Sequence, residues 1–217
     1  MPLFQLDPDD TYFPDPREAL TEPNGLLAVG GDLSPARLLQ AYRSGIFPWF
    51  SPGDPILWWS PDPRTVLFPD DIIIHRSLRK TLKNHPFDIH INRDFKAVLE
   101  ACAAPRAQQS GTWITSEMQQ AYLRLHSMGY AYSIESWRND MLVGGLYGVK
   151  MGRIFFGESM FSRVSDASKA ALVALCQGAL GSSPRVIDCQ FSTEHLLSLG
   201  AKSIPRTEFL ALLRSSI

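Results

Sequence analysis

The chain has 217 residues, of which 21 are lysine or arginine and 22 are aspartate or glutamate, so its formal net charge is −1. Hydrophobic residues make up 45% and charged residues 20%, which is ordinary for a globular protein and excludes a disordered, collagen-like or coiled-coil chain. The balanced charge excludes a protein that is basic throughout, so any contact with a nucleic acid must come from a local patch.

Cysteine and histidine usage gives no sign of a disulfide framework or a metal site. The three cysteines are widely spaced without a CxxC pair, and the five histidines form no HExxH or HxH cluster. The first residues are acidic where a signal peptide would be basic, and no apolar run approaches the ~18 residues that span a bilayer. We therefore expect a reduced, cytoplasmic protein without a metal or a membrane segment.

The first 70 residues hold twelve of the sixteen prolines and three of the five tryptophans. Such a composition is typical of a segment with many turns and few long elements. One helix is predicted within it, capped by Ser34 and ended by Gly45. The composition changes near residues 60–64, which predicts a small N-terminal domain over 1–62 and a larger domain over 63–217.

Regular elements follow from residue 65 onward. Ser116 and Gln119 have the spacing of a capping box, which predicts a helix over 116–128. Three strands joined by tight turns are predicted next, at 130–138, 141–151 and 153–161. The other predicted strands are 65–69, 87–92, 185–190 and 201–206, and the other helices are 77–84, 94–103, 166–180, 192–199 and 207–215. This order predicts an α+β fold in which helices cover the faces of a sheet.

The order of helix, three-strand meander, helix, strand, helix and strand resembles the acetyltransferase fold of the GNAT superfamily. In that superfamily the pyrophosphate of coenzyme A lies on an R/Q-x-x-G-x-G/A loop after the meander. The equivalent stretch here, residues 163–168, has Asp166 in place of the first glycine and Ser168 at the second position. A carboxylate repels a pyrophosphate and a missing glycine removes the close backbone approach, so we expect a donor other than coenzyme A.

The predicted strand 185–190 contains an aspartate among apolar residues. Alternation along a strand places Asp188 and Gln190 on one face, and Ile187 and Cys189 on the other. A buried aspartate is costly unless it is hydrogen-bonded or functional, and a carboxylate beside a carboxamide can orient an incoming amine. A structural aspartate at a strand end is the alternative interpretation.

The aromatic run FFGESMF at 155–161 holds a second carboxylate, Glu158. A nucleophile elbow would need a glycine two residues after Ser159, where Phe161 stands, so a serine hydrolase is not expected. Glu158 is suited to a cationic or hydroxyl-bearing substrate, or to the solvated face of a strand.

The predicted helix 77–84, together with Arg76, presents four basic residues on one face. Arg76, Arg79, Lys80 and Lys83 recur at helical spacing opposite Leu78 and Leu82. A solvated surface is the default explanation, yet this face also suits a phosphate backbone. Trp49 and Trp113 are candidates for stacking on a nucleobase, although most tryptophans belong to the core.

Taken together, the longer motifs resemble one family, the bacterial leucyl/phenylalanyl-tRNA–protein transferases. The segments that carry the resemblance include FPDPREALTEPNGLLAVGGDLSPARLLQAYRSGIFPWF (13–50), WWSPDPR (58–64), GTWIT (111–115), LVGGLYGV (142–149), FGESMFSR (156–163), DASKAAL (166–172) and IDCQ (187–190). They cover most of the chain.

The resemblance implies transfer of leucine or phenylalanine, and less well methionine, from aminoacyl-tRNA to proteins with N-terminal arginine or lysine. The product enters the bacterial N-degron pathway. Because the aminoacyl ester is already activated, no cofactor, metal or nucleoside triphosphate is required, and the site must supply orientation and charge stabilisation. The implied partners are leucyl-tRNA, phenylalanyl-tRNA and the acceptor proteins, and we expect a monomer.

The resemblance also implies roles for named residues. Asp188 and Gln190 act on the reacting amine; a neutral carboxamide is a very poor base, so we expect Asp188 to accept a proton or orient and Gln190 to position. Trp49, Trp113 and Glu158 bind the terminal adenosine. The basic face holds the acceptor stem without reading its sequence. The pocket for the aminoacyl side chain is lined by Leu146, Phe155, Met160, Leu172 and Ile187.

Two other functions stay open on the sequence. An acyl-coenzyme-A N-acetyltransferase would share the fold but is opposed by Asp166 and Ser168. A noncatalytic tRNA-binding module would keep the basic face but leave Asp188 and Gln190 unexplained.

Overall fold

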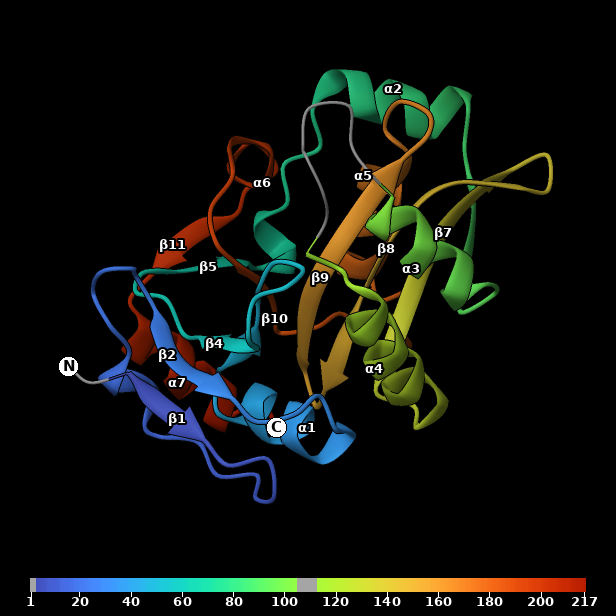
Figure 1. Cartoon of the computed structure of the whole chain (residues 1–217). Coiled ribbons are helices and arrows are strands. Elements are labelled where there is room, and N and C mark those ends of the chain that lie inside the picture. Colours follow the sequence, from blue (N-terminus) through green and yellow to red (C-terminus); the bar gives the residue numbers. More distant parts are fainter. Residues whose placement is uncertain (1–2, 105–112) are drawn as a thin grey trace.

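The computed structural model describes residues 3–104 and 113–217, which form an α+β fold with two sheets (Figure 1). The smaller sheet has the strand order β1-β2-β4-β3 and lies beside helix α1 (Pro35–Arg43). Its strands are β1 (Phe4–Leu6), β2 (Leu26–Gly30), β3 (Phe47–Pro48) and β4 (Leu57–Trp59). Two short 3-10 turns, Pro16–Glu18 and Pro69–Asp71, complete this half of the chain.

The larger sheet has the order β11-β5-β10-β9-β8-β7-β6. The parallel pair β9–β10 interrupts antiparallel pairings on both sides. The strands are β5 (Arg64–Leu67), β6 (Asp88–Ile91), β7 (Ala131–Arg138), β8 (Met141–Met151), β9 (Ile154–Ser162), β10 (Val186–Gln190) and β11 (Lys202–Ile204).

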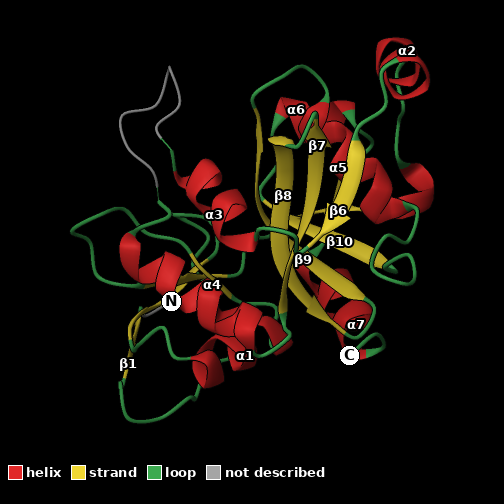
Figure 2. Ribbon diagram, turned by 90° about the vertical axis from the view of Figure 1, so that its right-hand side faces the viewer, coloured by secondary structure: helices red, strands yellow, loops and turns green. Residues whose placement is uncertain are grey.

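Helices cover both faces of the larger sheet (Figure 2). On β8, Tyr147 contacts the rings of Phe95 and Tyr122, whereas the next residue toward the N-terminus, Leu146, packs in a cluster with Leu172. Adjacent strand residues point to opposite faces, so α3 and α4 lie on one side and α5 on the other. The helices are α2 (Arg76–Asn84), α3 (Phe95–Ala103), α4 (Ser116–Ser127), α5 (Ala167–Cys176), α6 (Glu194–Ser198) and α7 (Arg206–Arg214).

The α+β prediction and every helix and strand predicted after residue 64 are confirmed, with two corrections to helix ends. The helix over 166–180 ends at Cys176, because Gly178 takes a φ of 88° that stops the helix. Helix α4 is capped by Thr115, whose side chain accepts from the Met118 N–H, so the predicted Ser116 capping box is wrong. The four short strands before residue 60 were not predicted.

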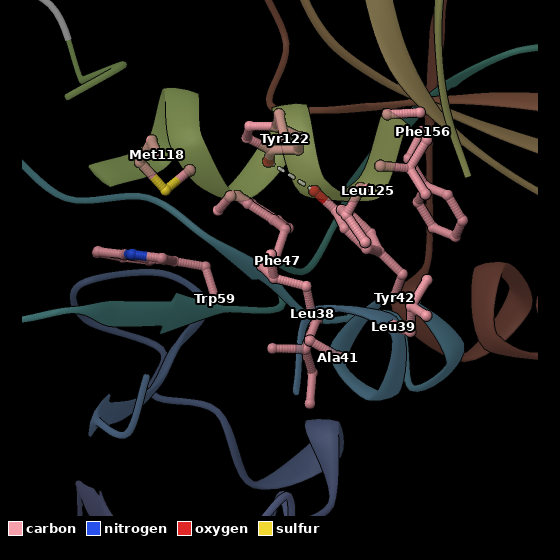
Figure 3. Packing of buried hydrophobic residues seen from close by; sticks show 14 of the residues in the cluster. Leu38, Leu39, Ala41, Tyr42, Phe47, Trp59, Met118, Tyr122, Leu125 and Phe156 are labelled. Carbon is pink, nitrogen blue, oxygen red and sulfur yellow. Dashed lines mark hydrogen bonds between the residues drawn. The ribbon is translucent and has the colours of Figure 1, made fainter. Parts of the chain in front are cut away.

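The main core lies between the smaller sheet, α1, α4 and the face of the larger sheet that α3 and α4 cover. Figure 3 shows Leu38 and Tyr42 of α1 packed against Tyr122 and Leu125 of α4, with Phe156 of β9 beside them. Residues from the N-terminal segment thus share one apolar interior with the larger sheet, and burial of these side chains stabilises their contact.

Candidate active site

A cleft of about 970 Å³ opens where β9 and β10 separate. These two strands pair in parallel over only three positions, from Val186 opposite Ile154 to Asp188 opposite Phe156. Beyond that point Gly157, Glu158 and Ser159 of β9 and Cys189 and Gln190 of β10 line the cleft. The gap in the sheet therefore supplies a concave site with backbone and side chains from two rigid strands.

A β-bulge on β9 sets the direction of Glu158. Opposite β8, Ser159 pairs with Tyr147 and Gly157 pairs with Gly148, so Glu158 is the extra residue. A bulge re-aims the side chain it carries and bends the strand. Glu158 is half-buried at the cleft and its carboxylate meets two tyrosines from other elements.

A second bulge on β10 sets the direction of Gln190. Opposite β5, Asp188 pairs with Val66 and Gln190 pairs with Thr65, so Cys189 is the extra residue. Gln190 takes a φ of 58°, in the left-handed region that non-glycine residues seldom adopt. The alternation used in the sequence analysis stops here, and the expectation of an unbroken strand pattern is wrong at this point.

The two residues of the predicted catalytic pair have different surroundings. Gln190 lines the cleft, is 9% exposed, and its side-chain Nε2 is buried without a hydrogen-bond partner among the described residues. Asp188 is fully buried outside the cleft lining, and both its oxygens accept from Arg64, at 2.7 Å each. Its Oδ1 also accepts the backbone N–H of Gln190 at 3.1 Å. Asp188 is therefore connected to the cleft through Gln190.

Glu158 belongs to a ring of three short oxygen contacts. Its two oxygens lie 2.7 Å from the hydroxyls of Tyr42 and Tyr122, which lie 2.7 Å from each other (Figure 3 shows the tyrosine pair). Two hydroxyls supply two protons for three contacts, so a protonated carboxyl completes the ring. Burial raises the pKa of Glu158 to about 7, against the lowering effect of the two tyrosine hydrogen bonds.

One end of the cleft is apolar. The five residues predicted for the aminoacyl side chain all line it, and they come from β8, β9, α5 and β10: Leu146, Phe155, Met160, Leu172 and Ile187. All but Met160 are buried. A surface of this kind favours an apolar group over a polar one.

The two predicted stacking residues also line the cleft. Trp49 is 43% exposed, and its ring packs edge-on or tilted against Trp59 and Phe191. Trp113 is half-buried against the main core. An exposed ring fixed by aromatic neighbours is available for stacking.

The predicted basic face lies apart from the cleft lining, on α2. Arg76, Arg79, Lys80 and Lys83 are exposed, while Leu78 on the other side of the helix is buried. The amphipathic arrangement expected from the sequence is confirmed.

The comparisons with known proteins agree with one another. The family described as "Leucyl/phenylalanyl-tRNA protein transferase" matches residues 66–214, and the N-terminal domain of the same family matches residues 31–62. The chain belongs to the leucyl/phenylalanyl-tRNA protein transferase family. This confirms the resemblance inferred from its motifs.

Relatives of the same name cover nearly the whole chain. The leucyl/phenylalanyl-tRNA–protein transferase of Methylococcus capsulatus is 60% identical over 97% of this chain and 90% of its own. That of Shigella dysenteriae is 56% identical over 97% of this chain and 89% of its own. Among solved structures, L-PGS from Bacillus licheniformis shares 12% identity with a TM-score of 0.40, covering 79% of this chain and 57% of that one.

Several groups at the site of this transferase were not found from the sequence. Arg64 was assigned only to a domain boundary, although a buried aspartate such as Asp188 requires a cationic or hydrogen-bonding partner. Tyr42 and Tyr122 fall within predicted helices, and neither was given a role. Of the segment GTWIT, Gly111 and Thr112 lie outside the described residues.

Neither a metal site nor a membrane segment is found in the described part of the chain. Within residues 3–104 and 113–217, histidine, cysteine, aspartate and glutamate side chains form no group of three that could hold a metal ion. Over the same ranges, every helix is too short or too polar to cross a membrane.

Proposed function

We propose that the protein transfers leucine or phenylalanine, and less well methionine, from aminoacyl-tRNA to proteins that begin with arginine or lysine. The acceptor amine attacks the ester carbonyl, a C–N bond forms and the C–O bond to the ribose breaks. The amine loses a proton and the ribose oxygen gains one. The product is a longer N-terminus that marks the protein for N-degron degradation.

The observation that carries this proposal is the buried side-chain Nε2 of Gln190, which has no hydrogen-bond partner among the described residues, in a cleft with an apolar end. Buried polar atoms nearly always have a hydrogen-bond partner, so an unpaired donor at a cleft is explained by a ligand that completes it. An N–H group aimed at the ester carbonyl stabilises the oxyanion that develops during attack. Gln190 then acts as a donor, and its very weak basicity is no obstacle.

Asp188 fits the orienting role better than the proton-accepting one. Its carboxylate oxygens are occupied by Arg64 and by the Gln190 N–H, and none of them lines the cleft. A carboxylate in that position holds the backbone of Gln190 and contacts no substrate. In this proposal Gln190 is the catalytic residue and Asp188 positions it.

The rest of the cleft matches the donor substrate. Trp49 and Trp113 offer rings for the terminal adenine. Glu158, unlike Asp188, lines the cleft, and a carboxyl oxygen that already contacts a tyrosine hydroxyl can accept a second hydrogen bond from a ribose hydroxyl. The five apolar residues at the other end suit a leucine or phenylalanine side chain, and the flexible Met160 can adjust to either. The basic face on α2 would hold the phosphates of the acceptor stem.

We further propose that residues 63–217 form a GNAT-like catalytic domain and residues 1–62 a small N-terminal domain, and that the protein acts as a cytoplasmic monomer. The element order and the splayed parallel strands β9 and β10 support the fold assignment. Asp166, just before α5, accepts hydrogen bonds from Thr81 and Lys169 and keeps a carboxylate where a coenzyme A pyrophosphate would need to lie.

A transfer assay tests the proposal. Purified protein is given labelled leucyl-tRNA and a peptide that begins with arginine, and peptide-bound label is measured. We expect transfer to this peptide and none to the same peptide with an acetylated N-terminus. Binding of tRNA without transfer would contradict the proposal and favour a noncatalytic module. Acetyl transfer from acetyl-coenzyme A would favour the acetyltransferase.

A further inference from the structure

Arg64 is a fully buried arginine whose guanidinium is bound on every side. It stands at the start of β5 and its side chain is 0% exposed, as is that of Asp188. Nε donates to Oδ1 of Asp188 and Nη2 donates to Oδ2, both at 2.7 Å. This two-point geometry is available to arginine and not to lysine, because only a guanidinium presents a planar fork of donors.

The rest of the guanidinium connects distant segments of the chain. Nη1 donates to the carbonyl oxygen of Gly45 at 3.1 Å, directly after α1. The ring of Phe47 lies 4.7 Å from the guanidinium carbon and the ring of Phe209 on α7 lies 4.6 Å from it. Both aromatic contacts are favourable for a cation and hold the group in one orientation.

Asp188 passes this constraint on to the cleft. Its Oδ1 accepts the backbone N–H of Gln190 across the bulge on β10, and Gln190 sits in the left-handed region with a φ of 58°. A conformation of this kind persists only when its surroundings fix it. We infer that Arg64 is a positioning residue of the transferase: through Asp188 it fixes the Gln190 backbone, and so aims the Gln190 carboxamide into the cleft. This inference rests on the proposed function.

The alternative is that the Arg64–Asp188 ion pair only stabilises the fold. An experiment can separate this structural role from the positioning role. A buried ion pair contributes little net stability compared with two well-packed apolar side chains, whereas removing one partner is strongly destabilising. Replacing both partners by apolar residues therefore restores the fold without restoring the acceptor for the Gln190 N–H. Stability and catalysis should part in that double variant.

The experiment measures kcat and KM for leucyl-tRNA, together with the thermal midpoint, in Arg64→Lys, Arg64→Met and Arg64→Met/Asp188→Leu. We expect kcat to fall about 10²-fold in Arg64→Met, since a small displacement of a reacting group has that effect. KM should change little, because the lost interaction is made in the transition state. Arg64→Lys should recover part of kcat. The double variant should recover the thermal midpoint while its kcat stays low.

Arg37 provides the matched control. It is also a fully buried arginine: it pairs with Asp32 at 2.8 Å and donates to the carbonyl oxygens of Asp7 and Asp10, and it does not line the cleft. Arg37→Lys should lower the thermal midpoint and leave kcat unchanged.

Two results would overturn the inference: a wild-type kcat in Arg64→Lys and Arg64→Met, or a double variant that regains kcat together with its thermal midpoint. If the wild-type protein transfers no leucine, the proposed function fails first. Wild-type transfer combined with either of these two results overturns the role of Arg64 alone.

Discussion

Glu135 and Glu158 belong to the same sheet but have different hydrogen-bonding surroundings. Glu135 is buried and Glu158 is half-buried. Glu135 on β7 is 0% exposed and accepts from three independent donors: the Asp94 N–H and the Ser133 hydroxyl on Oε1, and the Trp137 indole on Oε2. Each contact has its own proton, so all three hydrogen bonds form without a proton from the carboxyl group of Glu135. Through the Asp94 N–H, these hydrogen bonds join β7 to the start of α3.

Glu158 differs in having donors that also contact each other. Tyr42 and Tyr122 supply two protons for three short contacts, and Glu158 lines the cleft. The third proton comes from the carboxyl itself, which agrees with a pKa of about 7. The two glutamates differ in the number of protons that their neighbours supply: a complete set around Glu135 indicates a structural role, and a shortfall around Glu158 beside the cleft indicates a site.

The largest expected effect concerns the unpaired donor at the same cleft. Gln190→Ala removes the carboxamide N–H, and we expect kcat for leucine transfer to fall ~10²–10³-fold, as for the loss of one oxyanion donor. The control is Gln177→Ala, because Gln177 is exposed at the end of α5. A wild-type kcat in Gln190→Ala would show that the unpaired Nε2 of Gln190 takes no part in the transfer reaction.

The second effect concerns exposed charges, the four basic residues on α2. Changing Arg76, Arg79, Lys80 and Lys83 to glutamine should flatten the salt dependence of tRNA binding by ~0.7–0.9 in log–log slope per lost phosphate contact. If all four contacts are lost, the wild-type protein should then lose about 50- to 150-fold more affinity than the variant between 50 and 200 mM salt.

A short aminoacyl-adenosine donor lacks the acceptor stem and should react equally well with the wild-type protein and the α2 variant. Arg153→Gln/Arg214→Gln removes two exposed arginines outside α2 and serves as the charge control. If the salt dependence of tRNA binding were unchanged in the α2 variant, this face would be a solvated surface that does not contact tRNA.

The third effect separates the two glutamates directly. The folded protein holds the Glu158 proton more tightly than the unfolded chain, so this stability is complete below the ordinary pKa and is lost as pH rises through about 7. Glu158→Gln carries its own N–H and completes the ring. Relative to wild type it should gain at most about 3 kcal/mol of unfolding free energy between pH 5 and pH 8.

Glu135→Gln should behave in the opposite way. One carboxylate oxygen becomes an NH₂ group that faces a donor, so the variant should lose about 1–3 kcal/mol while its kcat stays at the wild-type value. Denaturant unfolding across the pH range measures both variants. If Glu158→Gln and Glu135→Gln changed the unfolding free energy in the same way across the pH range, the two glutamates would not differ as proposed.

The smallest effect concerns the apolar end of the cleft. Met160→Ala enlarges the pocket and should shift the ratio of leucine to phenylalanine transferred toward phenylalanine by roughly tenfold, the lower end of what one methylene is worth in such a pocket. Competition between leucyl-tRNA and phenylalanyl-tRNA in one reaction measures the ratio. An unchanged ratio would place the selecting surface elsewhere.

Much of the fold was predictable because its signals are local. The meander of β7, β8 and β9 follows from alternation and tight turns, and α1 from its Ser34 cap. The smaller sheet was missed because its strands have two to five residues, too few for a period to be recognised among prolines.

The site was predictable in composition and not in geometry. Apart from Asp188, every residue predicted for the cleft lines it, largely because the family motifs carried those positions. The two bulges were invisible, since one extra residue in a strand leaves no mark on its composition. Arg64 was missed because its partner, Asp188, lies 124 positions away, and pairing across that distance is a property of the fold.

That separation has a consequence for how the enzyme is made. The ribosome produces Arg64 124 residues before Asp188, and at ~5–20 residues per second the delay is roughly 6–25 s. Through that interval the guanidinium has no carboxylate, and the ring of Phe209 is made later still. A nascent chain therefore emerges from the ribosome with the surroundings of Arg64 incomplete, and these contacts are complete only when α7 has been synthesised and docked.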